Sequence, residues 1–444
     1  MIDSPRPGNV RWQIFAVACA TSCILYLHRF SFNFIKPSLE AEHGFSETEL
    51  AWLYTAFSIG YGLGQIPSGV FGDLFGTRRF LGAVIATWSL LLACIGLTGS
   101  YPLLCCVFFT FGLAQSGCYP SLARVTREWF PLRIRTTIQG FVATLSGRLG
   151  GFLSPIILGT LLIGFCGLGW KSALVVMGGG GVLLCVWFLV VFRSSPESHP
   201  RVNRAERELI TEGEAVPTGD DAPGLLPFRR VLRNRGALIF LGQQAFSAGA
   251  DSIYVLHMGD YFLNTLGVDV ATAGILIGLP VLGGAIGGGL VGGPLCDWMI
   301  TATGSRRWGR STVGFLGKTF AGLLMLLAIG QDSALGAGIC LFAVKFFNDW
   351  SQPTVWGTIT DLGGRYCGTM FGTLNTAGMV GNLVFLPLFG WILDANRTVL
   401  IVDGVEKAVE NYNPVFLAVA AMYMVSAVSW LFIDCTKSLD REAS

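Results

Sequence analysis

The sequence predicts an all-α membrane protein whose 12 transmembrane helices form two six-helix, pseudo-symmetric bundles. Twelve long apolar runs predict the helices, because each has about the 20 residues that a helix needs to cross a bilayer. One charged, proline-containing stretch separates six runs from six. Only 13% of the 444 residues are charged, about half the share that is typical of soluble domains. Most of the surface is therefore expected to face lipid.

The predicted spans follow one another with short connections. In the first half they cover residues 12–35, 49–72, 79–99, 102–123, 137–165 and 170–193. In the second half they cover residues 236–263, 270–298, 311–330, 334–359, 367–393 and 413–434. These spans predict an N-terminal bundle at 1–193, a central loop at 194–235 and a C-terminal bundle at 236–444. A polar connection is expected near 394–412.

Basic residues are distributed unevenly among the loops. Most of the 30 Lys and Arg residues lie in the two termini, the central loop and the other loops on the same side. The opposite loops hold only Lys36, Lys171, Arg397 and Lys407. By the positive-inside rule, both termini and the central loop are cytoplasmic, in a cell inner membrane. The basic clusters then serve as orientation signals, and no nucleic-acid partner is expected.

Composition gives no indication of enzymatic chemistry. The 12 cysteines are scattered through apolar runs, and none has metal-ligand spacing with a histidine. The sequence contains no nucleotide-binding loop and no arrangement of a nucleophile with a base. We therefore expect no catalytic residues, no metal and no cofactor.

The connection after the second span carries a compact charged motif. Asp73 closes the span, Gly76 supplies a turn, and Arg78 and Arg79 follow. These groups predict a charge latch on the cytoplasmic side. Together with Gly69 they resemble the signature of the major facilitator superfamily, although the residue after the aspartate departs from it. The resemblance implies the major facilitator fold and transport by alternating access.

A narrower resemblance covers most of the chain. Residues 61–69, 129–135, 196–207 and 361–378 are similar to segments of the anion:cation symporter family. That family includes sugar-acid and other organic-anion transporters. The resemblance implies that the substrate is a small organic anion, commonly moved together with protons.

Arg29 is the leading candidate for the substrate contact. It lies in the outer half of the first span, and ionisable groups at membrane depth are costly and usually functional. Its planar fork of donors suits a carboxylate. The resemblance also implies that a first-helix arginine binds the anionic group of the substrate. The alternative is an arginine that reaches the outer headgroups.

Other polar residues at membrane depth extend the candidate site. Tyr61, Gln115 and Asn375 are expected to hydrogen-bond the substrate, with helix-to-helix hydrogen bonds as the alternative. Arg148 is either a second anion contact or a cation that packs between helices. Lys345 is a candidate for the substrate site.

Lys345 also lies one helical turn from Asp349, so the two residues share a face and can neutralise each other. Asp251 lies near the middle of the seventh span. Lys318, in the ninth span, is expected to extend toward the inner membrane surface.

The first six spans have no acidic residue in their interior. Many members of the symporter family carry an aspartate where this chain has His28 and a glutamate where it has Gln115. The remaining candidates for proton coupling are His28, Asp251 and Asp349. A histidine with its ordinary pKa titrates near neutral pH, which makes His28 a coupling candidate, and it is also a candidate substrate contact as a neutral hydrogen-bonding partner.

These features predict a secondary active transporter, a monomer in the lipid bilayer, that moves a sugar acid or another carboxylate with a proton or another cation. The alternatives are a sugar-phosphate or phosphate exchanger and an anion uniporter driven by the membrane potential. A ligand sensor that does not transport is a further alternative. The short central loop and tails argue against a sensor, because they leave no room for an output domain.

Overall fold

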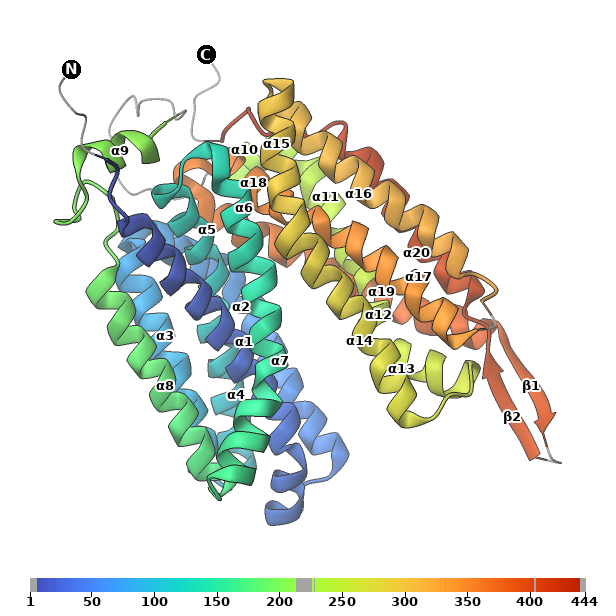
Figure 1. Ribbon diagram of the computed structural model, residues 1–444. Coiled ribbons are helices and arrows are strands. Elements are labelled where there is room, and N and C mark those ends of the chain that lie inside the picture. Colours follow the sequence, from blue (N-terminus) through green and yellow to red (C-terminus); the bar gives the residue numbers. More distant parts are fainter. Residues whose placement is uncertain (1–5, 213–225, 227, 332, 403–404, 440–444) are drawn as a thin grey trace. The chain divides into compact units, whose positions relative to one another are not determined.

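The computed structural model describes residues 6–212, 226, 228–331, 333–402 and 405–439 (Figure 1). The chain divides into two compact units. Unit 1 comprises Met1–Pro227, Ile359–Thr373 and Ser438–Ser444, and unit 2 comprises Phe228–Thr358 and Leu374–Lys437. The predicted boundaries of the central loop, 194–235, stay a prediction.

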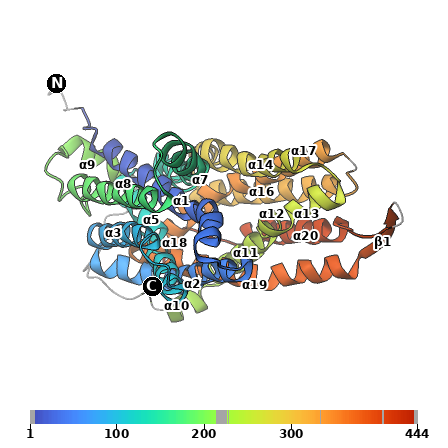
Figure 2. The same cartoon turned by 90° about the horizontal axis from the view of Figure 1, so that it is seen from below.

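Unit 1 contains the helices of the first half of the chain. They are α1 (Val10–His43), α2 (Glu47–Phe75), α3 (Thr77–Ile95), α4 (Tyr101–Gln115), α5 (Cys118–Trp129), α6 (Leu132–Gly140), α7 (Ser146–Pro155), α8 (Trp170–Val191) and the short α9 (Arg204–Ile210). The π-helical η1 (Phe141–Leu145) joins α6 to α7, and the π-helical η2 (Ile156–Phe165) continues α7, so that Leu132–Phe165 is one continuous span. Helices α3 and α8 run side by side in both views (Figures 1 and 2).

The second half of the chain supplies the remaining elements. They are α10 (Phe228–Arg233), α11 (Arg235–Asp251), α12 (Ile253–Leu256), α13 (Met258–Asp260), η3 (Tyr261–Thr265), α14 (Val270–Ile286), η4 (Gly287–Gly292), α15 (Gly293–Thr303), α16 (Arg306–Ala328), α17 (Ala334–Trp350), α18 (Gln352–Gly363), η5 (Gly364–Tyr366), α19 (Cys367–Ala395) and α20 (Asn413–Trp430). Strands β1 (Arg397–Val402) and β2 (Val405–Glu410) pair antiparallel, with Arg397 opposite Glu410.

Each of the twelve predicted spans coincides with a helical segment in the described residues. Nine described stretches are long and apolar enough to cross a membrane, and one of them, Ala334–Ala395, has 62 residues, enough for two crossings. The expected all-α membrane architecture is therefore confirmed. The polar connection expected near 394–412 holds the β1–β2 hairpin, which the all-α prediction did not include.

The first helix is capped by the segment that follows α8. Asn9 makes no side-chain cap at the start of α1. Instead, Glu206 of α9, which is fully buried, accepts a hydrogen bond from the backbone N–H of Arg11 at 3.0 Å and pairs with its guanidinium at 3.2 Å. A carboxylate at a helix N-terminus satisfies free N–H groups and complements the helix dipole.

Glycines bring helix backbones together where side chains would keep them apart. In unit 2 a glycine seam, defined by Gly283, Gly287 and Gly292, faces the backbone carbonyls of Phe342, Phe346 and Trp350 on α17. A Cβ on these glycines would lie 2.4, 2.0 and 2.1 Å from the respective carbonyl oxygens. The seam advances by four residues and then by five, and the longer step spans the π-helical η4. The wide turn therefore keeps the third glycine on the contact face.

Candidate functional site

Arg29 lies on α1 with its guanidinium held by a neutral partner. Its Nε donates a hydrogen bond to Oε1 of Gln115 on α4, at 3.0 Å. The amide of Gln115 is itself fixed, because its Nε2 donates to the backbone oxygen of Leu25 at 3.3 Å. The fully buried Gln115 therefore orients the arginine without neutralising its charge.

Aromatic rings surround the same guanidinium. Its central carbon lies 4.5 Å from the ring centre of Tyr61, 4.9 Å from that of Tyr26 and 5.4 Å from that of Phe57. We call these three rings the aromatic cage. Cation–π attraction stabilises the charge over the ring faces. The rings lie over the face of the guanidinium, so its N–H groups, which point outward in its plane, can still donate to a ligand.

One terminal nitrogen of this arginine lacks an acceptor. Nη2 of Arg29 is buried and has no hydrogen-bond partner within the described part of the chain. Arg29 also makes no ion pair with a carboxylate in that part. An unsatisfied buried donor is expensive, and the unpaired charge is consistent with a site that an anion completes.

Two glycines set the distance between the helices that form the cage. A Cβ on Gly60 of α2 would lie 2.0 Å from the backbone oxygen of Phe109, and a Cβ on Gly112 of α4 would lie 2.0 Å from that of Phe57. The contact is reciprocal, so α2 and α4 approach as closely as their backbones allow. This approach lets Tyr61 on α2 and Gln115 on α4 contact the same side chain, that of Arg29.

His28 points away from the guanidinium of its neighbour. Its Nε2 donates to the backbone oxygen of Met177 on α8 at 3.1 Å, and only 2% of the residue is exposed. A Cβ on Gly181 of α8 would meet its Cε1 at 2.7 Å. His28 and Arg29 therefore contact different helices, because consecutive helix residues project about 100° apart, and the role of His28 in the site stays a prediction.

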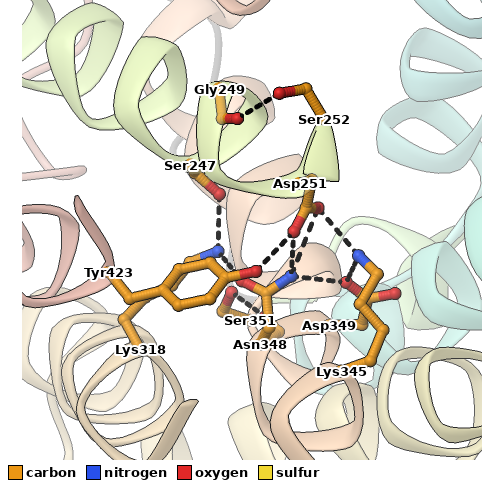
Figure 3. Close-up of polar contacts among 10 residues, drawn as sticks. All are labelled: Ser247, Gly249, Asp251, Ser252, Lys318, Lys345, Asn348, Asp349, Ser351 and Tyr423. Carbon is orange, nitrogen blue, oxygen red and sulfur yellow. Dashed lines mark hydrogen bonds and ion pairs between the residues drawn. The ribbon is translucent and has the colours of Figure 1, made fainter. Parts of the chain in front are cut away.

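A second polar group forms in unit 2 (Figure 3). We call it the C-half network, and it comprises Ser247 and Asp251 on α11, Lys318 on α16, Lys345, Asn348 and Asp349 on α17, and Tyr423 on α20. Ser247 and Asp251 are four residues apart, and the α17 residues follow i, i+3 and i+4 spacing. Each helix therefore presents one polar face to the others.

Both aspartates of the network are well supplied with donors. Lys345 Nζ lies 2.7 Å from an oxygen of Asp251 and 2.7 Å from one of Asp349. Nδ2 of Asn348 donates to Asp251 at 3.0 Å and to Asp349 at 2.8 Å. The hydroxyl of Tyr423 donates to Asp251 at 2.8 Å. The structure thus brings together the three ionisable residues singled out in this half, Asp251, Lys345 and Asp349.

Lys318 lies elsewhere than the sequence suggested. It is fully buried, and its Nζ donates to Oγ of Ser247 at 2.6 Å and to Oδ1 of Asn348. The expectation that it extends toward the inner membrane surface is wrong, because its side chain is enclosed by α11, α17 and α20. Asn348 and Tyr423 were missed, since an isolated amide or hydroxyl in an apolar span has no distinctive pattern.

Asp73 of the gate motif binds the start of α19 within unit 1. It accepts hydrogen bonds from the backbone N–H groups of Gly368 and Thr369 at 3.1 and 2.8 Å, and from Oγ1 of Thr369 at 2.6 Å. A carboxylate at a helix start satisfies N–H groups that have no partner within the helix. Arg124 of α5 lies 3.4 Å from the same carboxylate. A Cβ on Gly69 would lie 2.3 Å from the oxygen of Gly368, so this position requires a glycine.

The paired arginines of the motif have other roles than the predicted latch. Arg78 donates to the backbone oxygens of Leu189 and Phe192 at 2.6 and 2.9 Å, where α8 ends. Arg79 is exposed. The basic partner of Asp73 is therefore Arg124, which lies too far along the sequence for the motif to reveal it. Gly76 has φ of 80°, a left-handed conformation that favours glycine between α2 and α3.

Arg148 and Asn375 stay predictions. Arg148 lies half-buried on α7, next to Gly147, whose Cβ would meet the hydroxyl of Tyr119 at 2.8 Å. Asn375 lies half-buried on α19 in unit 2. In the described ranges, no group of three His, Cys, Asp or Glu side chains has metal-binding geometry.

Comparison with known proteins covers nearly the whole chain. A family model described as Major Facilitator Superfamily matches residues 18–386. The probable sulfoacetate transporter SauU of Cupriavidus necator is 27% identical over 438 residues, which is 97% of this chain and 96% of that protein. The probable galactarate/D-glucarate transporter GudP of Bacillus subtilis is 26% identical over 88% of this chain and 87% of its own. These relatives are described as transporters, not as enzymes.

Solved structures show the same fold. The human organic anion transporter MFSD10 (TETRAN) matches with a TM-score of 0.66 at 13% identity, over 95% of this chain and 99% of that one. The major facilitator transporter FucP in the outward conformation also has a TM-score of 0.66, at 14% identity, over 95% of this chain and 98% of that one. The predicted major facilitator fold is thereby confirmed.

Proposed function

Since the chain belongs to the major facilitator superfamily, we propose that it is a secondary active transporter that moves a small organic anion by alternating access, together with a proton. The observation that carries the proposal is the state of Arg29. Its guanidinium is held by the neutral Gln115 and the aromatic cage, and its buried Nη2 has no acceptor among the residues that the structure describes. An anionic group of the substrate completes this arrangement.

The geometry of the arginine favours a planar or trigonal anionic group. Gln115 occupies Nε, so the fork between the two terminal nitrogens is the one available for a ligand. Two parallel charge-assisted hydrogen bonds to a carboxylate or a sulfonate suit this fork. Tyr26 and Tyr61 add aromatic faces and hydroxyl groups beside it. These features fit the galactarate, D-glucarate and sulfoacetate for which the relatives are named.

The distribution of basic residues supports an orientation of the protein in the membrane. We propose that both termini and the central loop lie in the cytoplasm and that the protein works as a monomer in the inner membrane. Bacterial relatives support the inner membrane. Proton co-transport is supported by the C-half network, because its ionisable side chains lie in contact within one helical unit. Arg148 and Asn375 remain candidates for further substrate contacts.

Transport in liposomes tests this function. We expect purified protein to take up labelled D-glucarate or sulfoacetate by counterflow, and to accumulate it when the pH outside is lower than inside. Exchange of phosphate alone would favour a phosphate exchanger. Accumulation that follows an imposed potential without a pH gradient would favour a uniporter. Binding of an organic anion without any uptake would leave a sensor and reject transport.

Gln115→Glu tests the arginine site by adding a competing carboxylate beside Arg29. The new carboxylate pairs with Arg29 at Nε and competes with the substrate for the charge, so we expect affinity at pH 7.5 to fall about tenfold, or about 1.4 kcal/mol. Affinity should recover toward pH 5, where the glutamate is protonated. Calorimetric titration across this pH range measures the effect, and Gln331→Glu, at a half-buried position in the loop after α16, is the matched control. Unchanged affinity at pH 7.5 contradicts the proposed contact.

A further inference from the structure

The charged groups of the C-half network differ in the partners that they contact. Lys345 contacts both aspartates, Asn348 donates to both, and Tyr423 donates to Asp251. Donors of this kind favour the ionised form of a carboxylate. Asp349 is almost fully buried and keeps its charge through these partners, while the side chain of Asp251 is 25% exposed. Both carboxylates therefore have a cationic partner and hydrogen-bond donors in direct contact.

Lys318 has the opposite environment. It is fully buried, and its two hydrogen-bonding partners, Ser247 Oγ and Asn348 Oδ1, are neutral. The ring of Tyr423 lies 5.7 Å from its Nζ. Lys318 forms no ion pair with a carboxylate in the part of the chain that the structure describes. Burial without a direct counter-charge disfavours the ammonium form, so the charge on Lys318 is the least supported in the network.

Both partners of Lys318 tolerate loss of its proton. The hydroxyl of Ser247 accepts a hydrogen bond from the ammonium, and after rotation it donates to the lone pair of the neutral amine. Oδ1 of Asn348 accepts from either form of Lys318. A charged lysine has donors and no acceptor. Lys318 therefore contacts Oδ1 of the Asn348 amide, which leaves Nδ2 of Asn348 to donate to Asp251 and Asp349. The contacts of the aspartates therefore persist in both protonation states.

In the described residues, four helices carry the ionisable groups that surround Lys318. These groups are Asp251 on α11, Tyr254 on α12, Lys345 and Asp349 on α17, and Tyr423 on α20. In the described residues, α15 places no group within hydrogen-bonding or ion-pairing reach of Lys318. The two aspartates act on Lys318 through Asn348 and through space.

We propose that Lys318 is the group that takes up and releases the co-transported proton, and that Asp251 and Asp349 stay ionised throughout. This inference rests on the proposed proton-coupled transport and assigns its proton site. With Lys318 neutral, one lysine faces two aspartates and the network has a net charge of about −1, by counting ionised groups. The proton on Lys318 brings this charge to zero.

The main test is Lys318→Gln in the full-length protein in liposomes, with whichever of D-glucarate and sulfoacetate the wild type exchanges. We expect counterflow to remain within about threefold of wild type, because exchange needs no net proton movement. Accumulation driven by a pH gradient should fall at least about tenfold, and proton uptake, followed with an enclosed pH-sensitive dye, should disappear. Lys318→Gln that accumulates substrate like wild type overturns the proposal.

A second variant keeps the test decisive if Lys318→Gln does not fold. Ser247→Ala removes one acceptor of the ammonium, which lowers the proton affinity of Lys318. We expect half-maximal pH-driven uptake to shift by about 0.5–1 pH unit toward acid. Ser252→Ala is the matched control, because this buried serine donates to the backbone oxygen of Gly249 and does not contact the network (Figure 3). Equal profiles for the two serine variants overturn the assignment.

Two further results separate this inference from the proposed function. If Asp251→Asn or Asp349→Asn removes proton uptake while Lys318→Gln preserves it, the proton belongs to a carboxylate and the inference fails. If wild-type protein exchanges the anion but takes up no protons, the inference fails while transport stands. If wild-type protein moves none of the organic anions, the proposed function itself fails.

Discussion

Arg29→Ala is expected to lose substrate binding by about 100-fold or more. A hydrogen bond to a charged group contributes about 1.5–3 kcal/mol, so two of them on one guanidinium contribute about 3 kcal/mol or more. Since 1.4 kcal/mol changes affinity about tenfold, the Kd should rise by at least two orders of magnitude. Calorimetric titration with the transported anion measures this loss, and counterflow should disappear with it.

Two control variants show whether charge or shape is responsible. Arg29→Lys keeps the charge but loses the planar fork, so we expect it to recover part of the affinity. Arg204→Ala removes an arginine from the exposed α9 and should leave binding unchanged. The alanine variant also loses the hydrogen bond to Gln115 and the contacts with the aromatic cage, so its unfolding temperature is measured beside binding to confirm that it folds. Wild-type affinity in Arg29→Ala would leave the proposed site without its anchor.

Gly112→Ala is expected to damage the same site through the backbone. The added Cβ would lie 2.0 Å from the oxygen of Phe57 and 2.9 Å from the nitrogen of Tyr61. Both are backbone atoms, so no side-chain rotation relieves the overlap, and α2 must move away from α4. That movement separates Tyr61 from Gln115 and opens the aromatic cage around Arg29.

The expected cost is about 1–3 kcal/mol of stability, typical of overpacked cores, together with weaker anion binding. Thermal unfolding of the purified protein and calorimetric titration measure the two effects. Gly180→Ala on α8 is the matched control, because a Cβ there meets nothing within 4 Å. Alanine is also the better helix former, so the control should be neutral or slightly stabilising. Equal behaviour of the two variants would contradict the close-approach argument.

The twelve spans were predictable because lipid demands long, uniformly apolar segments, and this constraint is visible residue by residue. The contact among Arg29, Tyr61 and Gln115 agrees with the residues selected from membrane depth and family resemblance. The β1–β2 hairpin was missed, although Val399 to Val402 form a run with strong strand propensity. This run is much shorter than the apolar runs of the transmembrane spans, so a search for spans does not detect it.

The misplaced residues share a physical cause. Apolarity places a residue in a span but does not determine which face of the helix it occupies. Lys318 therefore looked like a residue that reaches the membrane surface, and the sequence did not show that His28 and Arg29 contact different helices. The contact between Asp73 and Arg124 joins residues 51 positions apart. Sequence motifs group residues that are close along the chain, so they assigned the carboxylate to Arg78 and Arg79 instead.

The π-helical η4 has a consequence for everything that follows it. Had the chain continued with regular α-helical spacing, Val291 rather than Gly292 would have met the carbonyl of Trp350. The additional residue in this turn rotates the rest of the span by about 100° around its axis. Asp297 on α15 owes its buried orientation to that rotation. A helical wheel drawn through the whole span with one constant period would place this carboxylate, and every residue after it, about 100° from its true position around the helix axis.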